Sequence, residues 1–304
     1  MKIGIVGAGG IGSYYAGLLS RAGHEVYLIA RGDHLRAIQA RGLEVRAPNE
    51  QFIAHPIATD DGASLAVCEY VIVSVKGYSL SDVAPMIAAS ARGGATIVPL
   101  LNGVEAANRL IAASVSRERI MGGLAAVSLF RTEPGVVERR SQFDRIVIGE
   151  LDRSRTERTQ RLADALKNAG VAASVSDDIQ LDLWRKFAFI VPMTVACGLS
   201  RRPIGATLSA QGGRDLIIGS VAEIAAVSRR GDAPLSPDDE ARIRDDLLAV
   251  QPAIRPSFLA DLERGGPTEV DILAGAVSRL GRERGVATPI HDVAATAFEA
   301  ATAS

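Results

Sequence analysis

The sequence opens on the stretch that decides the fold of its first half, Met1-Lys2-Ile3-Gly4-Ile5-Val6-Gly7-Ala8-Gly9-Gly10-Ile11-Gly12. Its apolar run predicts a strand that leads directly into a Gly-x-Gly-x-x-Gly turn. Residues 13–21 then predict a helix, and residues 25–29 predict a second strand that completes a βαβ unit. The motif therefore stands in the context that a dinucleotide-binding turn requires, with a glycine turn that serves only packing as the alternative.

Each glycine of this motif has a physical role. Gly7 permits the tight turn, Gly9 lets the backbone approach a pyrophosphate, and Gly12 lets the helix pack on the strand. The amides at the start of the helix then face the anion. We expect the cofactor-binding turn to consist of Gly7, Ala8, Gly9, Gly10, Ile11 and Gly12.

The residues after the second strand bear on the choice of cofactor. An NAD enzyme usually has Asp or Glu at this strand end, whereas an NADP enzyme tends to have Arg nearby. This sequence has Ala30-Arg31-Gly32, with Asp33 two residues further on. Because a guanidinium fork suits a 2′-phosphate, Arg31 favours NADPH/NADP+ over NADH, with a solvated arginine as the alternative.

Length and composition limit the classes of function. The 304 residues allow about two domains, and 47% hydrophobic residues are ample for two cores. The net charge of −1 gives no electrostatic footprint for nucleic acid or for an acidic membrane. The sequence shows no secretory leader and no membrane-spanning stretch, so we expect a cytoplasmic protein.

The cysteines and histidines predict neither a disulfide framework nor a metal site. Cys68 and Cys197 each lie inside an apolar segment, which suits a reducing compartment. The four histidines are scattered without ligand spacing.

The first half continues as alternating strands and helices. Residues 70–76 and 95–101 predict buried parallel strands, and residues 81–91 predict the helix between them. A doubly wound parallel sheet follows from this alternation, with its ligand at the carboxyl ends of the strands. Lys76 and Asn102 fall at such ends. Further strands over 120–128 and 145–149 on either side of a turn at 133–135, and a helix over 156–169, complete a Rossmann-type domain over residues 1–172.

The pattern changes to successive helices from about Asp177 onward. Residues 214–229, 237–250 and 269–284 have helical periodicity and are separated by proline and glycine loops. We therefore expect an α/β chain with a C-terminal all-helical domain over residues 173–304. The active site is expected in the cleft between the two domains.

Two charged residues of the second half suggest acid–base chemistry. Lys186 lies in the apolar segment 183–191, where an inward-pointing lysine is desolvated and its pKa falls toward the range useful for proton transfer. A lysine that reaches the surface is the alternative. Glu269 begins a helical pattern, and its alternative role is that of an ordinary carboxylate at a helix N-terminus.

An ordered set of motifs resembles the ketopantoate reductase family, also called 2-dehydropantoate 2-reductases, over nearly the whole chain. The set consists of residues 7–12, Arg31, Val75-Lys76, Leu101-Asn102-Gly103-Val104, Leu183-Trp184-Arg185-Lys186, Pro256-Ser257-Phe258-Leu259-Ala260-Asp261 and Thr268-Glu269-Val270-Asp271. The glycine motif is common to many folds. The combination of Asn-Gly, Trp-x-Lys and Thr-Glu-x-Asp is far more specific.

The resemblance implies an NADPH-dependent reductase of a 2-oxo acid, with its site residues as follows. Lys186 matches the lysine that donates a proton to the developing alkoxide, and Glu269 matches a glutamate at the nicotinamide end. The matching cofactor positions are Arg31, Lys76, Asn102 and the backbone of Ser128, and the matching substrate positions are Asn102, Lys186 and Ser257. Relatives suggest a homodimer through the helical domain, or a monomer.

The chain departs from the family at three positions that touch substrate. Family members that reduce ketopantoate often carry asparagines where this chain has Ile190, Thr194 and Ile204. An apolar side chain cannot replace an amide hydrogen bond, and each such loss costs about 1–3 kcal/mol. Pro192 could also kink the helix and displace the pocket. We expect reduction of ketopantoate to pantoate, in pantothenate biosynthesis. A reductase of a more apolar carbonyl compound and a non-catalytic NADPH-binding sensor are the alternatives.

Overall fold

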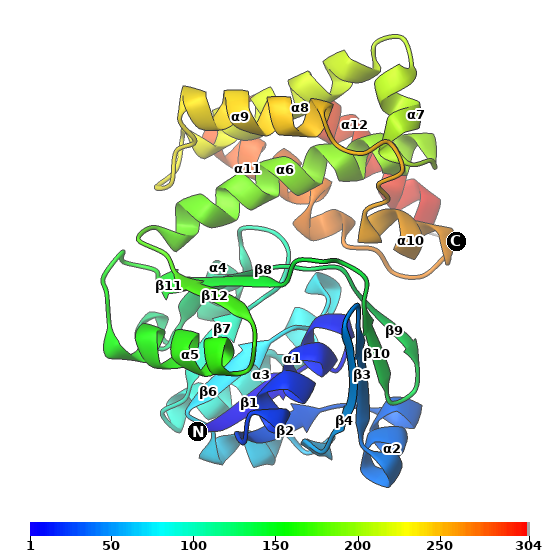
Figure 1. Ribbon diagram of the computed structural model, residues 1–304. Coiled ribbons are helices and arrows are strands. Elements are labelled where there is room, and N and C mark those ends of the chain that lie inside the picture. Colours follow the sequence, from blue (N-terminus) through cyan, green and yellow to red (C-terminus); the bar gives the residue numbers. More distant parts are fainter. Residues whose placement is uncertain (303–304) are drawn as a thin grey trace. The chain divides into compact units, whose positions relative to one another are not determined.

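The computed structural model describes residues 1–302, and the chain forms two compact units (Figure 1). Unit 1 consists of Met1–Leu101 and Ala106–Ile179. Unit 2 consists of Asn102–Glu105 and of the chain from Gln180 onward. The domain boundary expected between residues 172 and 173 stays a prediction.

A five-stranded parallel sheet forms the centre of unit 1. Its strands, in spatial order, are β5 (Ile57–Thr59), β2 (Glu25–Ile29), β1 (Lys2–Val6), β6 (Tyr70–Val73) and β7 (Thr96–Pro99). The strand order reverses at β1, so the carboxyl ends of β1 and β6 lie side by side at the point where such sheets bind ligands. The doubly wound parallel sheet predicted from the sequence is confirmed.

Five helices of unit 1 connect or flank these strands. They are α1 (Gly10–Arg21), α2 (Gly32–Arg41), α3 (Leu80–Arg92), α4 (Ala106–Ala112) and α5 (Glu157–Asn168). The α3 and α5 bounds agree with prediction to within a residue. Helix α1 begins at Gly10, three residues before the predicted start, so the last part of the glycine motif is itself the first helical turn.

Two smaller sheets complete unit 1. One has the order β4 (Glu50–Ala54), β3 (Leu43–Ala47), β10 (Val136–Arg139) and β9 (Leu129–Glu133). The other has the order β12 (Ala172–Val175), β11 (Arg145–Glu150) and β8 (Met121–Ala126). The predicted strands at 120–128 and 145–149 are thus β8 and β11, which pair antiparallel in a sheet of their own. Strands β9 and β10 on either side of the turn at 133–135 were not predicted.

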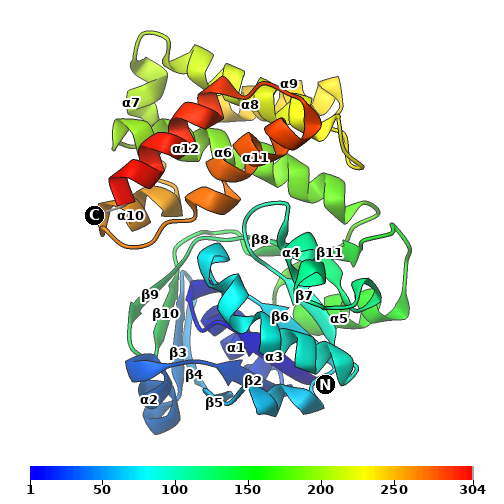
Figure 2. The ribbon, with the colours of Figure 1, turned by 180° about the vertical axis from the view of Figure 1, so that it is seen from behind.

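Unit 2 is helical, as predicted. Its α-helices are α6 (Ile179–Ser200), α7 (Ile204–Ser209), α8 (Gly213–Ser228), α9 (Pro237–Leu248), α10 (Ser257–Glu263), α11 (Ala274–Arg284) and α12 (Pro289–Thr302). Helices α8, α11 and α12 pack on one another, and Figure 2 shows α11 and α12 in orange and red. No helix among residues 1–302 is both long and apolar enough to cross a membrane.

The single helix predicted over residues 269–284 is wrong. A short 3-10 helix, η4 (Val270–Ile272), precedes α11, and Leu273 separates the two with φ −110° and ψ −102°. Glu269 therefore precedes a 3-10 turn and does not begin an α-helix.

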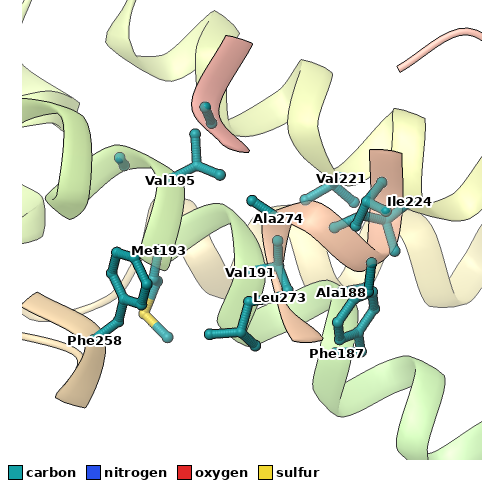
Figure 3. Close-up of a cluster of buried hydrophobic side chains, with 14 of the residues drawn as sticks. Phe187, Ala188, Val191, Met193, Val195, Val221, Ile224, Phe258, Leu273 and Ala274 are labelled. Carbon is teal, nitrogen blue, oxygen red and sulfur yellow. The ribbon is translucent and has the colours of Figure 1, made fainter. Parts of the chain in front are cut away.

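Helix α6 carries the core of unit 2. Figure 3 shows Ala188 and Val191 of α6 in one cluster with Val221 of α8 and with Leu273, which directly precedes α11. All four side chains are buried. The helix continues through Pro192 to Ser200, so the proline does not end it. One face of α6 is therefore fixed by packing, which in turn fixes the direction of the side chains on its other faces.

Candidate active site

The glycine turn of unit 1 has a backbone that only glycine can adopt at its first position. Gly7 has φ +104°, and a Cβ there would lie 2.8 Å from the backbone nitrogen of Val75. The Ser74 hydroxyl donates a hydrogen bond to the Gly7 carbonyl at 2.9 Å. These contacts tie the turn after β1 to the end of β6.

The other two motif glycines differ in what surrounds them. A Cβ on Gly12 would lie 1.9 Å from the Gly7 carbonyl oxygen, so α1 packs directly on the turn. A Cβ on Gly9 would meet nothing within 4 Å, so the backbone there is open to a ligand. Helix α1 has no side-chain cap and no acidic residue in its first turn among the described residues. Its free amides and the open Gly9 backbone fit the pyrophosphate of a dinucleotide.

Arg31 and Lys76 both follow strands of the parallel sheet. Arg31 is exposed at the N-cap position of α2, and its guanidinium has no hydrogen bond within the described chain. Asp33, the nearest carboxylate in sequence, is paired with Arg36. Lys76 is half-buried in the loop after β6, which ends at Val73 and not at residue 76 as predicted. The contacts with the cofactor that we expect of Arg31 and Lys76 stay predictions.

Ser128 already uses its backbone groups within unit 1. Its N–H donates to the Ser141 hydroxyl at 3.0 Å, and its carbonyl accepts from the Arg140 N–H at 3.0 Å. The backbone contact to the cofactor expected at Ser128 stays a prediction.

Unit 2 brings together three of the residues singled out in the sequence. Lys186 Nζ donates to Asn102 Oδ1 at 3.1 Å, and Asn102 Nδ2 donates to Glu269 Oε2 at 3.3 Å. Asn102 thus lies between a cation and a carboxylate, and its two partners fix which way its amide points. We call these three side chains the Lys-Asn-Glu array.

Burial and charge act in opposite directions on Lys186. Burial lowers the pKa of Lys186 from 10.5 to about 8, while the Glu269 carboxylate raises it. Glu269 itself is only 5% exposed. An ammonium with a pKa close to neutral is well matched to proton transfer in a reaction.

The sequence around Lys186 explains how α6 holds it. The ring of Trp184 packs edge-on against Phe187 at 5.6 Å between centroids, and the Arg284 guanidinium lies 5.4 Å from the Trp184 ring centre. Arg185 Nε donates to Asp239 Oδ1 of α9 at 2.9 Å. Because its neighbours on both sides are anchored, the Lys186 side chain has a defined direction.

The residues expected to touch substrate differ in how far they are buried and in what they contact. Ile190, one helical turn after Lys186, is half-buried and packs against the core of unit 2. Thr194 is 2% exposed and its hydroxyl donates to the Ile190 carbonyl at 2.9 Å, which is a backbone role. Ile204 is fully buried, and Ser257 is exposed in the first turn of α10. Their contacts with substrate stay predictions.

A network of ion pairs beside the array was not predicted from the sequence. Arg279 of α11 binds both Glu105 and Asp271. Nothing in the spacing of these three residues indicates that they meet, because each lies on a different element and charged residues are common on helix surfaces.

Comparison with known proteins identifies the family. The family profile described as "Ketopantoate reductase PanE/ApbA" matches residues 3–153, and the profile described as "Ketopantoate reductase PanE/ApbA C terminal" matches residues 178–301. This chain belongs to the ketopantoate reductase family. The resemblance stated from its motifs is confirmed.

Individual ketopantoate reductases and an oxidoreductase are similar to this chain over nearly their whole length. A 2-dehydropantoate 2-reductase from Mesorhizobium japonicum is 30% identical, over 96% of this chain and 95% of the relative. The uncharacterized oxidoreductase YkpB from Bacillus subtilis is 29% identical, over 95% of each chain. A crystal structure of a ketopantoate reductase from Ralstonia eutropha is 28% identical with a TM-score of 0.91, and covers 100% of this chain and 99% of that chain.

Membership in this family settles the class of reaction. Ketopantoate reductases are oxidoreductases that act on a CH–OH group, bind NAD(P)H and take a small-molecule substrate. The chain is therefore an oxidoreductase of this class.

Proposed function

We propose that this chain uses NADPH to reduce the ketone of a 2-oxo acid to a hydroxyl group, with ketopantoate as the substrate and Lys186 as the proton donor. The Lys-Asn-Glu array of unit 2 is the observation that carries the proposal. It combines a cation, an orienting amide and a carboxylate on three elements that are distant in sequence.

A proton donor in ketone reduction must neutralise the negative charge that develops on the carbonyl oxygen and must give that oxygen a proton. Lys186 can do both. The carbonyl oxygen gains negative charge as a hydride adds to its carbon, and it then needs one proton. The Lys186 ammonium has three N–H groups, of which Asn102 accepts one. A remaining N–H can donate to the oxygen, neutralise its charge and leave Lys186 as a neutral amine, which takes up a proton from solvent before the next turnover.

Asn102 and Glu269 support this role. The Glu269 carboxylate favours the charged form of Lys186, which is the form that can donate. Asn102 separates the carboxylate from the ammonium and fixes the direction of one of its three protons. The amide therefore orients Lys186 and keeps Glu269 from capturing its proton directly.

The residues of unit 1 that would hold NADPH are the glycine turn, Lys76 and Arg31. When bound, the reduced nicotinamide supplies the hydride of the reaction. The open Gly9 backbone and the amides of α1 would receive the pyrophosphate. The Arg31 guanidinium, which has no hydrogen bond or ion pair within residues 1–302, would receive the 2′-phosphate.

A second substrate class is favoured by one observation on α6. Ile190 presents an apolar side chain one turn from Lys186, and the Thr194 hydroxyl is already bound to the helix backbone. This face suits a 2-oxo acid with an apolar substituent in place of the hydroxymethyl group of ketopantoate.

Steady-state oxidation of NADPH by the purified protein tests the proposal. Ketopantoate and a 2-oxo acid of the same size that lacks its hydroxyl, 2-oxo-3,3-dimethylbutanoate, are compared at saturating NADPH. We expect turnover with ketopantoate. Turnover with the apolar acid alone would assign the second substrate class, and a protein that binds NADPH without reducing either acid would contradict the proposal.

A further inference from the structure

The segment Asn102–Glu105 belongs to unit 2, although the chain on both sides of it belongs to unit 1. Gly103 has φ +90°, and a Cβ there would lie 2.8 Å from the Ile272 carbonyl oxygen. The backbone of this segment therefore runs directly against η4 of the loop that carries Glu269. A side chain at Gly103 would force the two apart.

Arg279 of α11 bridges the same two stretches of chain. Its Nη2 donates to Glu105 Oε2 at 2.5 Å, and its Nη1 donates to Asp271 Oδ1 at 2.9 Å. Nη2 also lies within hydrogen-bond distance of the Asp271 carbonyl oxygen, at 3.3 Å. Glu105 is three residues after Asn102, and Asp271 is two residues after Glu269. The Arg279 guanidinium thus binds the end of the stretch that carries Asn102 and the end of the stretch that carries Glu269.

The contacts of Arg279 are of the kind that fix position. The Glu105 side chain is 15% exposed and that of Arg279 is 31% exposed, so water and salt screen the pair only in part. The guanidinium is planar and binds two carboxylates that lie in different directions. A lysine ammonium is a point charge on a flexible stem and does not hold two partners in such a fixed geometry. Arg282, three residues further along α11, is 71% exposed and binds Ser278 and Asp292, neither of which belongs to the array.

We propose that Arg279 is a positioning residue, which acts through Glu105 and Asp271 to hold Asn102 between Lys186 and Glu269. This inference rests on the proposed function, because it assigns a role in maintaining the array through which Lys186 donates its proton. Among the described residues, Arg279 itself makes no hydrogen bond or ion pair to a member of the array. Asn102 is joined to each of its partners by one hydrogen bond, so a small displacement of its segment breaks the array.

Two variants of α11 separate this role from general stability. Arg279→Met removes the fork and keeps much of the side-chain length, and Arg282→Met is the matched control on the same helix. With ketopantoate and NADPH, we expect Arg279→Met to lower kcat by roughly tenfold to a hundredfold, the usual effect of a misplaced catalytic group, and Arg282→Met to stay within about twofold of wild type. Arg279→Lys is expected to lie between them.

A titration that needs no substrate gives the second readout. The chain has four lysines, so NMR of protein labelled with ¹³C at lysine Cε resolves Lys186 once Lys186→Met has identified its signal. When Asn102 is displaced in Arg279→Met, the Lys186 ammonium loses the oxygen that accepts its hydrogen bond, which disfavours the charged form. The pKa of Lys186 is therefore expected to fall in Arg279→Met and to stay unchanged in Arg282→Met. If Arg279→Met does not fold, Glu105→Gln removes the same ion pair with little change of shape and is expected to act in the same direction.

The failure of this inference can be told apart from that of the proposed function. Arg279→Met with the kcat and the Lys186 pKa of Arg282→Met would overturn the positioning role, provided that Lys186→Met abolishes turnover. Turnover that persists in Lys186→Met would overturn the proposed function, and the inference with it.

Discussion

Raising the pH is expected to switch off turnover about two and a half pH units earlier than for an ordinary lysine donor. Burial places the pKa of Lys186 at about 8, against the usual 10.5. At pH 9 a group with a pKa of 8 is about 9% protonated, whereas one with a pKa of 10.5 is about 97% protonated. Because only the ammonium can donate, kcat/KM at pH 9 should be about one-tenth of its plateau at pH 6–7.

The assay is kcat/KM for ketopantoate between pH 6 and pH 10 at saturating NADPH, because this parameter reports groups on the enzyme before substrate binds. The NMR titration of Lys186 supplies the same pKa without turnover. A profile that stays flat to pH 10, or a kinetic midpoint that differs from the Lys186 midpoint by more than about one unit, would refute the reasoning that Lys186 is the titrating donor.

Three further predictions concern the cofactor and the substrate. Gly9→Ala should weaken NADPH binding by roughly tenfold or more, because of the two glycines only Gly9 is expected to face the pyrophosphate. The melting temperature of Gly9→Ala should match that of Gly266→Ala, since a Cβ meets nothing within 4 Å at either position, and equal NADPH dissociation constants for the two variants, measured by NADPH fluorescence, would contradict the cofactor-binding turn. Arg31→Glu should raise the NADPH dissociation constant by roughly ten- to a hundredfold and leave that of NADH within about threefold, since only NADPH has the 2′-phosphate; equal losses for both cofactors would show that Arg31 does not select NADPH. Ile190→Asn should raise kcat/KM for ketopantoate by roughly fivefold or more and lower it for 2-oxo-3,3-dimethylbutanoate, and a fall for both acids in a folded variant would exclude Ile190 as a selector of the substituent.

The sequence predicted the elements of the first half where the signal was local. The strand and glycine turn at residues 1–12 appear as β1 and the start of α1, and the later apolar runs appear as β6 and β7. Strand β3 has the residues Leu43-Glu44-Val45-Arg46-Ala47, whose alternation of apolar and polar residues is typical of a strand, although no strand was predicted there. The alternation that signals a strand is weaker in β9 and β10. They are short and mix exposed charge with buried valine, as in Glu133 and Val136.

The helix predicted from Glu269 onward fails for a reason that local pattern does not contain. Periodicity continues through Leu273, but the backbone there breaks between η4 and α11. Gly103, which is 169 residues earlier, lies against the Ile272 carbonyl at this break. A contact over such a separation overrides helix propensity and is invisible in a window of sequence.

The candidate site could be predicted in its members but not in its arrangement. Lys186, Asn102 and Glu269 were each singled out, and they are joined by hydrogen bonds across 84 and 167 residues of sequence. The burial of the Thr194 hydroxyl and the bridge through Arg279 depend on how helices pack. Residue type alone does not specify such packing.

The most direct test of the account is a comparison of Lys186→Met with wild type in two measurements on the same preparation, turnover of ketopantoate with NADPH and the dissociation constant for NADPH. Loss of the Lys186 donor should lower kcat by roughly a hundredfold or more and leave the dissociation constant within about threefold, because general acid catalysis contributes about that much and the glycine turn is untouched. Turnover at the wild-type rate in Lys186→Met would contradict the central claim that Lys186 supplies the proton.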